Sequence, residues 1–362
     1  MVRIKRAIHF AVPKSVVPLV LASLVSSGRL FALPAGAGPL TFSFQAQSAP
    51  TLTDFWNGQA TWVEDAGKIG SSFGFHFASI LPREGDLYAF YIGHYTAADG
   101  RSKLTVSRAR GTNGINWTNE GMVVDVGRAA QAMNGAPPLW DDRLASFPGA
   151  WKDGDTWYLV YEGAAENIAF SPGDIGLATS TDGQHFVKHP NNPILRHNAS
   201  GWERVNIGTP SLYKENGIWY LFYHGYDGNV CQIGVASGTS FTNLTKSPAN
   251  PILPVTTGTT AWDTGTIGKR SSIAKEGAYY YFAFEGSTPQ PYERAKWSSG
   301  LARSTNLLSA WIKCPRNPMI PQTPGGMGHD GPELLRLDDT WYLYLRAPVG
   351  PGTERFRLSR MP

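Results

Sequence analysis

A segment of about sixty residues recurs along this chain, and its period constrains the fold more than any other feature. The clearest copy runs from Pro210 to Gly225 and reads Pro-Ser-Leu-Tyr-Lys-Glu-Asn-Gly-Ile-Trp-Tyr-Leu-Phe-Tyr-His-Gly. Two close copies and two weaker ones also occur, so that five hydrophobic runs begin at Leu87, Trp157, Trp219, Tyr280 and Trp341. The spacings between these starts are 70, 62, 61 and 61 residues.

Each copy has the composition of β-structure. Short aromatic and aliphatic runs alternate with Gly, Pro, Asn and Asp, which favour turns. A long period built from such runs is typical of propeller blades and not of a helical solenoid. The sequence therefore predicts an all-β fold, a five-bladed β-propeller. The blades are expected near residues 73–125, 140–195, 202–253, 262–320 and 326–362.

The last copy ends before its blade is complete. Each of the other copies supplies an inner hairpin, a third strand and an outer strand, whereas the chain stops at Pro362 after the third strand of the fifth copy. An N-terminal strand, residues 60–64 or residues 40–44, is expected to close the last blade and to remove its free edge. Deletion of residues 54–65 should therefore be strongly destabilising.

The N-terminal segment differs from the rest of the chain. Arg3, Lys5 and Arg6 precede an apolar stretch, and small residues follow near Ala35. This is the pattern of a signal peptide, expected over residues 1–37, and its apolar run is too short for a membrane anchor. We therefore predict that residues 38–362 form the mature propeller domain and that the protein is secreted or periplasmic.

The basic charge of the chain is concentrated in this leader. Without the five basic residues of segment 1–53, the formal net charge changes from +4 to −1. The remaining chain gives no reason to expect nucleic acid or membrane as a partner, and we expect a monomer. Two cysteines, Cys231 and Cys314, are too few for a disulfide framework. No cofactor is expected, and no transition metal, because the spacing of His76, His329 and Asp330 matches no metal motif.

Function is expected where the copies differ, because repeated residues are explained by repeated geometry. In a propeller, the inner strands begin and the second strands end at the same face. The second-strand ends are Ile92, Glu162, His224, Glu285 and Arg346, and the inner-strand starts are His76, Ser146, Gly208, Lys269 and Asp330, with Arg270 and His329 adjacent. Polar side chains gathered at one channel are costly unless they are paired or used. The ring is thus either a set of satisfied channel residues or a functional site.

The loops before the inner strands add further polar residues. A Trp followed by an acid recurs there, with Asp141, Glu203 and Asp263 as the acids. We predict a structural role for these three, with each Trp packed between blades. Asp142 and Arg204 depart from the repeat and are expected near the same channel mouth.

Paired carboxylates across a pocket can cleave a glycosidic bond, one as proton donor and the other as base or nucleophile. The candidate catalytic residues are Glu162, Glu285, Asp142 and Asp330. The candidate substrate-binding residues are His76, Arg204, His224, Lys269, Arg270, His329 and Arg346. Replacing Glu162 or Glu285 by Gln is expected to lower turnover by orders of magnitude.

The repeated motifs also resemble a known group of enzymes. Trp-Asp, Pro-Ser-Leu, Trp-Tyr-Leu-Phe-Tyr-x-Gly and Asn-Pro-Ile-Leu, over residues 55–362, are similar to motifs of the five-bladed β-propeller glycoside hydrolases, which include arabinanases, β-xylosidases, invertases, levansucrases and mannoside phosphorylases. The resemblance implies an Asp base, a second Asp and a Glu acid at inner-strand starts. Here Phe77 and Phe147 occupy positions of Asp, and Gly208 stands where the third blade could offer the acid. Only Asp330 matches such a carboxylate position, in a different blade, so the catalytic set is not transferred.

The sequence thus predicts a glycosidase that acts on an oligo- or polysaccharide. Three alternatives remain open. A carbohydrate-binding propeller should repeat one pocket in each blade, which the unlike rings do not favour. A phosphorylase could hold phosphate with Lys269, Arg270 and Arg346. A polysaccharide lyase could use His76 or His224 as its base. The sugar, its linkage, endo or exo action and the stereochemical outcome also stay open.

Overall fold

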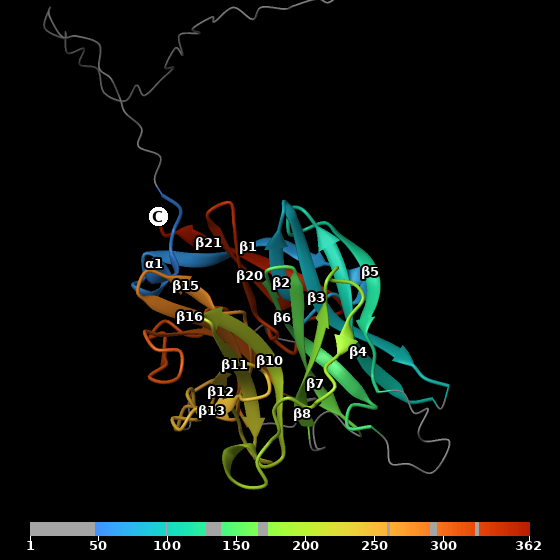
Figure 1. Ribbon diagram of the computed structural model, residues 1–362. Helices are drawn as coiled ribbons and strands as arrows, with labels where there is room; N and C mark the ends of the chain where they lie inside the picture. The colour runs from blue at the N-terminus through green and yellow to red at the C-terminus, as the bar shows by residue number, and fades with distance from the viewer. Residues whose placement is uncertain are drawn as a thin grey trace, which may run out of the picture. The chain divides into compact units, whose positions relative to one another are not determined.

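Almost all regular structure in the protein is β-strand (Figure 1). The computed structural model describes residues 48–98, 100–127, 139–165, 173–258, 261–289, 295–322 and 326–362, without the side chain of Lys269. The predicted leader, residues 1–37, and the candidate closing strand 40–44 lie outside the described residues. Among the helices of the described residues, none is long and apolar enough to cross a membrane.

The strands form antiparallel meanders that follow the sequence repeat. Meander 1 contains β2 (Ser79–Arg83), β3 (Asp86–Thr96), β4 (Ser102–Gly111) and β5 (Trp117–Val124); meander 2 contains β6 (Leu144–Asp153), β7 (Thr156–Ala164), β8 (Gly173–Ser180) and β9 (Val187–Lys188); meander 3 contains β10 (Asn206–Glu215), β11 (Ile218–Tyr226), β12 (Cys231–Gly238) and β13 (Thr245–Lys246). Meander 4 contains β14 (Thr266–Arg270), β15 (Ala274–Glu276), β16 (Tyr279–Ser287), β17 (Trp297–Ser304) and β18 (Ile312–Lys313); meander 5 contains β19 (Glu333–Leu337), β20 (Thr340–Arg346) and β21 (Thr353–Arg360).

An N-terminal strand completes meander 5. Strand β1 (Ala60–Ile69) pairs antiparallel with β21, with Ala60 opposite Arg360 and Glu64 opposite Phe356. The resulting sheet has the order β1-β21-β20-β19. Figure 1 shows β1 beside β21, with the short helix α1 (Leu52–Trp56) next to it. Of the two closing segments that the sequence offers, residues 60–64 therefore provide the strand.

Successive meanders are joined at one end. Single parallel bridges link the third strand of one meander to the start of the next: Leu104 to Leu144, Gly173 to Asn206, Cys231 to Thr266, and Trp297 to Gly328. The first strands β2, β6 and β10 lie toward the middle of the view in Figure 1, whereas β5 and β13 lie toward its rim. The starts of the first strands therefore lie beside the preceding meander.

The repeated Trp and acid pack as the repeat predicts. Trp140 stacks on Tyr161 with ring centres 5.9 Å apart, and Trp202 and Trp262 make the equivalent contacts with Tyr223 and Phe284. Each acid forms an ion pair with a lysine of the outer strand in its meander: Asp141 with Lys188, Glu203 with Lys246, and Asp263 with Lys313. These contacts fix the loops that carry Asp142 and Arg204.

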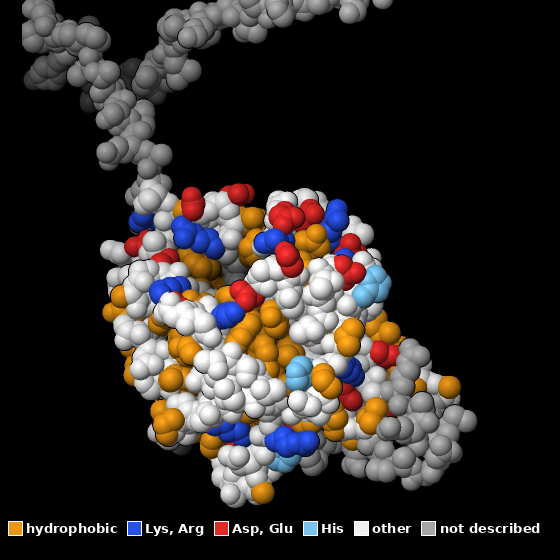
Figure 2. Space-filling model, viewed as in Figure 1, with side chains coloured by type: hydrophobic (Ala, Val, Ile, Leu, Met, Phe, Trp, Pro, Cys, Tyr) orange, Lys and Arg blue, Asp and Glu red, His pale blue; other side chains and the backbone are white. Residues whose placement is uncertain are grey.

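The starts of the first strands carry polar residues, whereas the face seen in Figure 2 has an apolar centre. Figure 2 shows apolar side chains gathered near the middle of the viewed face, with charged side chains of both signs around them. Ring contacts between Trp151 and Tyr213, and between Tyr213 and Tyr280, join the hairpin ends of meanders 2, 3 and 4.

Candidate active site

The backbone is strained where the first strands begin. Phe77, Phe147 and Thr209 have φ angles of 52°, 52° and 41°, and Gly331 has a φ of 59° at the same place in meander 5. We call these four the bulge residues. In meanders 2 and 3, the pairing register shifts at this point. Non-glycine residues adopt this conformation only where their surroundings hold it, and such positions are frequent at functional sites.

Two of the predicted catalytic glutamates hold bulge residues in place. The N–H of Thr209 donates to Oε2 of Glu162 at 2.9 Å, and the N–H of Gly331 donates to Oε2 of Glu285 at 2.7 Å. In both cases, a glutamate at the end of one meander's second strand binds the start of the next meander. We call these contacts the Glu162 clamp and the Glu285 clamp. Both carboxylates therefore lie between successive meanders and are nearly excluded from solvent.

The Glu162 clamp explains the glycine before Thr209. A Cβ atom added to Gly208 would lie 2.0 Å from Oε2 of Glu162, so no side chain fits there. Burial raises the pKa of Glu162 to about 8, although the hydrogen bond from Thr209 opposes this shift. Glu162 is thus expected to be largely protonated at neutral pH.

The residues around Thr209 form a network of buried hydrogen bonds. His224 contacts the Thr209 hydroxyl through Nδ1 at 2.8 Å and Asn206 Oδ1 through Nε2 at 3.1 Å. Arg270 donates to the carbonyl of Thr209 at 2.9 Å and to that of Phe222 at 2.5 Å. Burial lowers the pKa of His224 to about 3 and that of Arg270 to about 9. The structure therefore places these two predicted binding residues in the interior, where they hold backbone.

The Glu285 clamp lies next to a second buried carboxylate. Asp330 is 0% exposed, and its Oδ2 pairs with Nη2 of Arg346 at 2.5 Å. Among the described residues, its other oxygen, Oδ1, has no hydrogen-bond partner. Burial raises the pKa of Asp330, the charge of Arg346 opposes this shift, and the charge of Glu285 adds to it. Glu285 and Asp330 therefore interact electrostatically, with Arg346 paired to Asp330 and Arg270 close enough to interact with Glu285.

Aromatic side chains surround this pair. The guanidinium of Arg346 lies 5.6 Å from the ring centre of Phe77, and the Phe77 ring meets the rings of His76 and Phe147 edge to face at 5.6 and 5.5 Å. Burial lowers the pKa of His76 to about 4, and the charge of Arg346 contributes to this shift. His76 is thus neutral at physiological pH. We call Glu285, Asp330, Arg346, His76 and Phe77 the axial cluster.

Three other predicted binding residues have different surroundings. His329 is buried next to Asp330, where its Nε2 contacts Oε2 of Glu354 at 2.7 Å and its ring packs against Phe356. Arg204 is exposed and follows the 3₁₀ turn Gly201–Glu203. The side chain of Lys269 lies outside the described residues.

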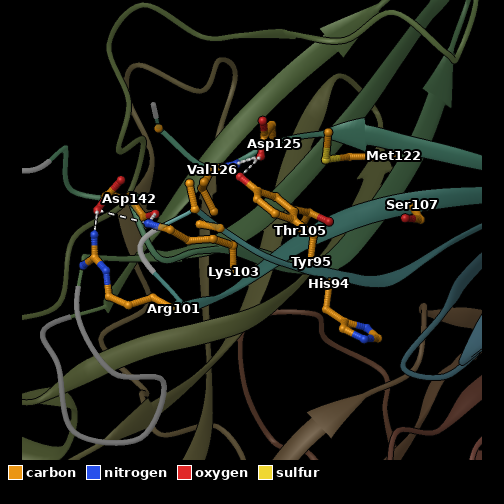
Figure 3. Close-up of a pocket in the computed structure, with 13 residues that line it drawn as sticks. His94, Tyr95, Arg101, Lys103, Thr105, Ser107, Met122, Asp125, Val126 and Asp142 are labelled. Carbon is orange, nitrogen blue, oxygen red and sulfur yellow. Dashed lines mark hydrogen bonds and ion pairs between the residues drawn. The ribbon is translucent and has the colours of Figure 1, made fainter. Parts of the chain in front are cut away.

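Asp142 lies in a pocket between meanders 1 and 2. The pocket has a volume of about 780 Å³ and is lined largely by β4, the end of β3 and the end of β5. Oδ2 of Asp142 lies 3.3 Å from Nζ of Lys103 and 3.6 Å from Nη2 of Arg101. Figure 3 shows these three residues at one end, with Ser107 and Met122 at the other. We call this cavity the β4 pocket.

The β4 pocket and the axial cluster interact electrostatically through a histidine from each. His94 lines the pocket, and its charge is one of the influences that lower the pKa of His76. The Ser146 hydroxyl also donates to the carbonyl of Thr105, a pocket residue, at 2.7 Å. Sequence reasoning missed Arg101, Lys103 and Thr105. Their alternation along β4 is a usable signal, but only the approach of Asp142 from meander 2 makes them a site.

Within the described ranges, no group of three or more His, Cys, Asp or Glu residues is arranged to hold a metal ion. The carboxylates have other partners instead: Glu162 and Glu285 accept backbone N–H groups, and Asp330 and Asp142 face cations. The arrangement suits proton transfer and the stabilisation of charge by fixed cations.

Comparison of folds identifies glycoside hydrolases as structural neighbours. The structure of a BT0996 RGII complex has a TM-score of 0.64 at 16% identity, over 85% of this protein and 94% of its neighbour. A thermostable family-43 glycoside hydrolase has a TM-score of 0.58 at 16% identity, over 82% and 92%. Zg3597, a family 117 glycoside hydrolase from the marine bacterium Zobellia galactanivorans, has a TM-score of 0.59 at 11% identity, over 83% and 90%.

No protein-family model and no curated protein matches the chain in sequence. At identities of 11–16%, the structural likeness concerns the fold. The neighbours belong to the five-bladed propeller superfamily that the sequence motifs resemble. The chain therefore has the fold of the propeller glycoside hydrolases, without assignment to one of their families.

Proposed function

We propose that the protein is an exported glycoside hydrolase in which the five meanders are the blades of a propeller closed by β1. The observation that carries the proposal is the buried pair of Glu285 and Asp330 beside Arg346. The fold shared with glycoside hydrolases supports it. Export rests on the sequence of residues 1–37.

Asp330 is the proposed proton donor. Its raised pKa keeps a proton on the carboxyl group near neutral pH, and its Oδ1 is the atom that lacks a partner among the described residues. Glu285 is the proposed base or nucleophile, since it is the carboxylate next to Asp330 and the N–H of Gly331 holds it in place. Arg346 would stabilise the charge that develops as the proton leaves. Glu162 and Asp142 remain candidate catalytic carboxylates. Glu162 lies in the clamp that holds Thr209, and Asp142 lies in the β4 pocket.

The substrate is proposed to approach past Arg346 and Phe147, which are both half-buried. Phe147 presents an aromatic surface on which a sugar ring can pack, and its strained backbone fixes that ring relative to Phe77. His76, neutral beside them, donates through Nδ1 to the carbonyl of Gly74, so its Nε2 can accept a hydrogen bond from a sugar hydroxyl.

The geometry removes one candidate residue from each of two alternatives. A phosphorylase needs cationic donors that face phosphate, whereas the guanidinium of Arg270 donates to the carbonyls of Thr209 and Phe222. A lyase needs a free base, and both ring nitrogens of His224 have partners, which leaves His76 as the candidate base. A non-catalytic binding propeller needs no raised carboxyl pKa, so the axial cluster favours an enzyme over that alternative as well.

The test is a screen of the purified protein against polysaccharides and aryl glycosides. We expect new reducing ends from at least one substrate, and NMR of the first-formed anomer then reports retention or inversion. Dependence of the rate on added phosphate would indicate a phosphorylase, and an ultraviolet-absorbing unsaturated product would indicate a lyase. Binding without turnover across the panel would contradict the proposal.

A further inference from the structure

Polar side chains line the β4 pocket in a regular row, and none of them belongs to the axial cluster. Lys103, Thr105 and Ser107 all line the cavity because alternate residues of a strand face the same side. Arg101, which directly precedes β4, continues the alternation and also lines the cavity. The row therefore runs from two cations to two hydroxyls. In Figure 3, the cationic end lies beside Asp142, and the hydroxyl end lies toward Met122.

Lys103 is an unusual residue for a pocket wall, since only 5% of its surface is exposed. Its ammonium group donates to the carbonyl of Asp142 at 2.6 Å and lies 3.3 Å from Oδ2 of the same residue. An ammonium group has three N–H donors, and these contacts use two. A buried cation is costly unless its donors are used, so the third N–H is available for an acceptor in the cavity.

The two hydroxyls at the other end of the row fit because residue 93 is a glycine. A Cβ atom on Gly93 would lie 2.3 Å from Oγ of Ser107 and 2.7 Å from Oγ1 of Thr105, so the glycine leaves room for both hydroxyls. Met122, which is 48% exposed, provides an apolar surface beside them. A second acid, Asp125, accepts a hydrogen bond from the Tyr95 hydroxyl at 3.1 Å on another wall.

We infer that the β4 pocket is a subsite for an acidic sugar, whose anionic group lies against Lys103 and Arg101 and whose hydroxyls lie along Thr105 and Ser107. The volume of about 780 Å³ is sufficient for one or two sugar rings. The anion is a uronate carboxylate or a sulfate ester, since both offer several acceptor oxygens to the two cations. The inference rests on the proposed function in one respect, the carbohydrate nature of the ligand.

Binding of three matched glycosides tests this inference. Methyl galactopyranoside, its uronate and its 6-sulfate differ only at C6, and the glucose series repeats the comparison. Calorimetric or NMR titration should show that at least one anionic form in a series binds about tenfold more tightly than the neutral form, a preference that weakens in high salt. The stronger anionic arm identifies the source of the charge. Equal affinity of neutral and anionic forms, or binding of none of them, would overturn the inference.

Three variants locate the site. Arg101→Gln should remove most of the preference for the anionic forms, because it deletes one cation and leaves Lys103 paired with Asp142. Thr105→Val should weaken all three glycosides of a series to a similar degree. Arg336→Gln is the matched control, since this arginine is also exposed and ion-paired, to Asp339 in the β19–β20 turn. An unchanged preference in Arg101→Gln would place the anion elsewhere and overturn the assignment.

The test separates this inference from the proposed function, because binding needs no turnover. An acidic preference that depends on Arg101, in a protein that cleaves nothing in the panel, would leave the subsite and remove the hydrolase. Cleavage of neutral glycans without any preference for acidic sugars would support the hydrolase and remove the subsite.

Discussion

The Glu162 clamp and the Glu285 clamp are the same hydrogen bond in two places, yet their surroundings differ. Around Thr209, the hydroxyl, the carbonyl and the N–H all have buried partners. At the other junction, the N–H of Gly331 is likewise bound by Glu285. The preceding residue, however, is Asp330, a buried carboxylate with one oxygen that has no partner within the described part of the chain. Where the N–H, hydroxyl and carbonyl of the bulge residue all have partners, the junction contributes rigidity. Where a carboxylate oxygen is left over beside a cation, it has the capacity for chemistry.

The largest expected effect is a loss of turnover when the carboxylate of Asp330 is removed. Asp330→Asn keeps the size of the side chain but removes the acidic proton, so kcat should fall by about 10²–10⁴-fold on the substrate found in the screen. A thermal melt close to that of the wild type serves as the control for folding. Wild-type turnover in a folded Asp330→Asn protein would remove the proposed chemical difference between the two clamps.

The second effect compares the two glutamates directly. Glu285→Gln and Glu162→Gln each leave a carbonyl oxygen that can accept the N–H of Gly331 or Thr209. If Glu285 is the base or nucleophile, its variant should lose about 10²-fold or more in kcat. The loss in Glu162→Gln should be smaller by at least about tenfold. Equal losses in steady-state kinetics would make Glu162 a full member of the catalytic set, as the sequence alone predicts.

A third substitution breaks the Glu162 clamp from the other side. The Cβ atom of Gly208→Ala would lie 2.0 Å from Oε2 of Glu162, so the carboxyl group must move away from Thr209. Overpacking and the loss of the hydrogen bond should lower the free energy of unfolding by about 1–3 kcal/mol, measured in urea. Unchanged stability would show that the clamp does not hold the junction.

The most gradual effect is a pH dependence of stability. The pKa of Glu162 is raised from 4.5 to about 8 in the folded protein, so between these values the folded state binds more protons than the unfolded state. Its contribution to stability therefore decreases as the pH rises from 4.5 to 8, by at most about 1.4 kcal/mol per pH unit. Glu162→Gln should lack this decline when unfolding is followed at pH 5, 6, 7 and 8. Parallel stability curves for variant and wild type would contradict the raised pKa.

Much of the fold was accessible from the sequence because the repeat records local geometry. The hairpins that turn just before Trp157 and Trp219, the Trp-acid pairs and the need for an N-terminal strand beside the last strand follow from patterns within a single copy or from a count of strands. The choice between residues 60–64 and 40–44 came only from the structure. The meeting of Glu285 with Asp330 was partly accessible, because the repeat aligns the ends of strands at one face.

The clamps and the β4 pocket were not accessible in this way. That Glu162 binds the N–H of Thr209 depends on contact between two meanders and on a φ of 41°, which no residue type in the sequence indicates. Likewise, Lys103 belongs to a third strand that any propeller would have, and its role emerges only where Asp142 arrives from the next meander. Each copy keeps one sequence pattern, but the contacts between neighbouring copies vary. A repeat therefore does not predict those contacts.

The pairing of β1 with β21 has a consequence for biosynthesis. Residues 60–69 leave the ribosome well before their partners, residues 353–360. Until those partners have been made, β1 has no neighbouring strand and the closing sheet cannot form. Closure of this sheet therefore depends on a contact between residues far apart in sequence, which forms more slowly than the local hairpins.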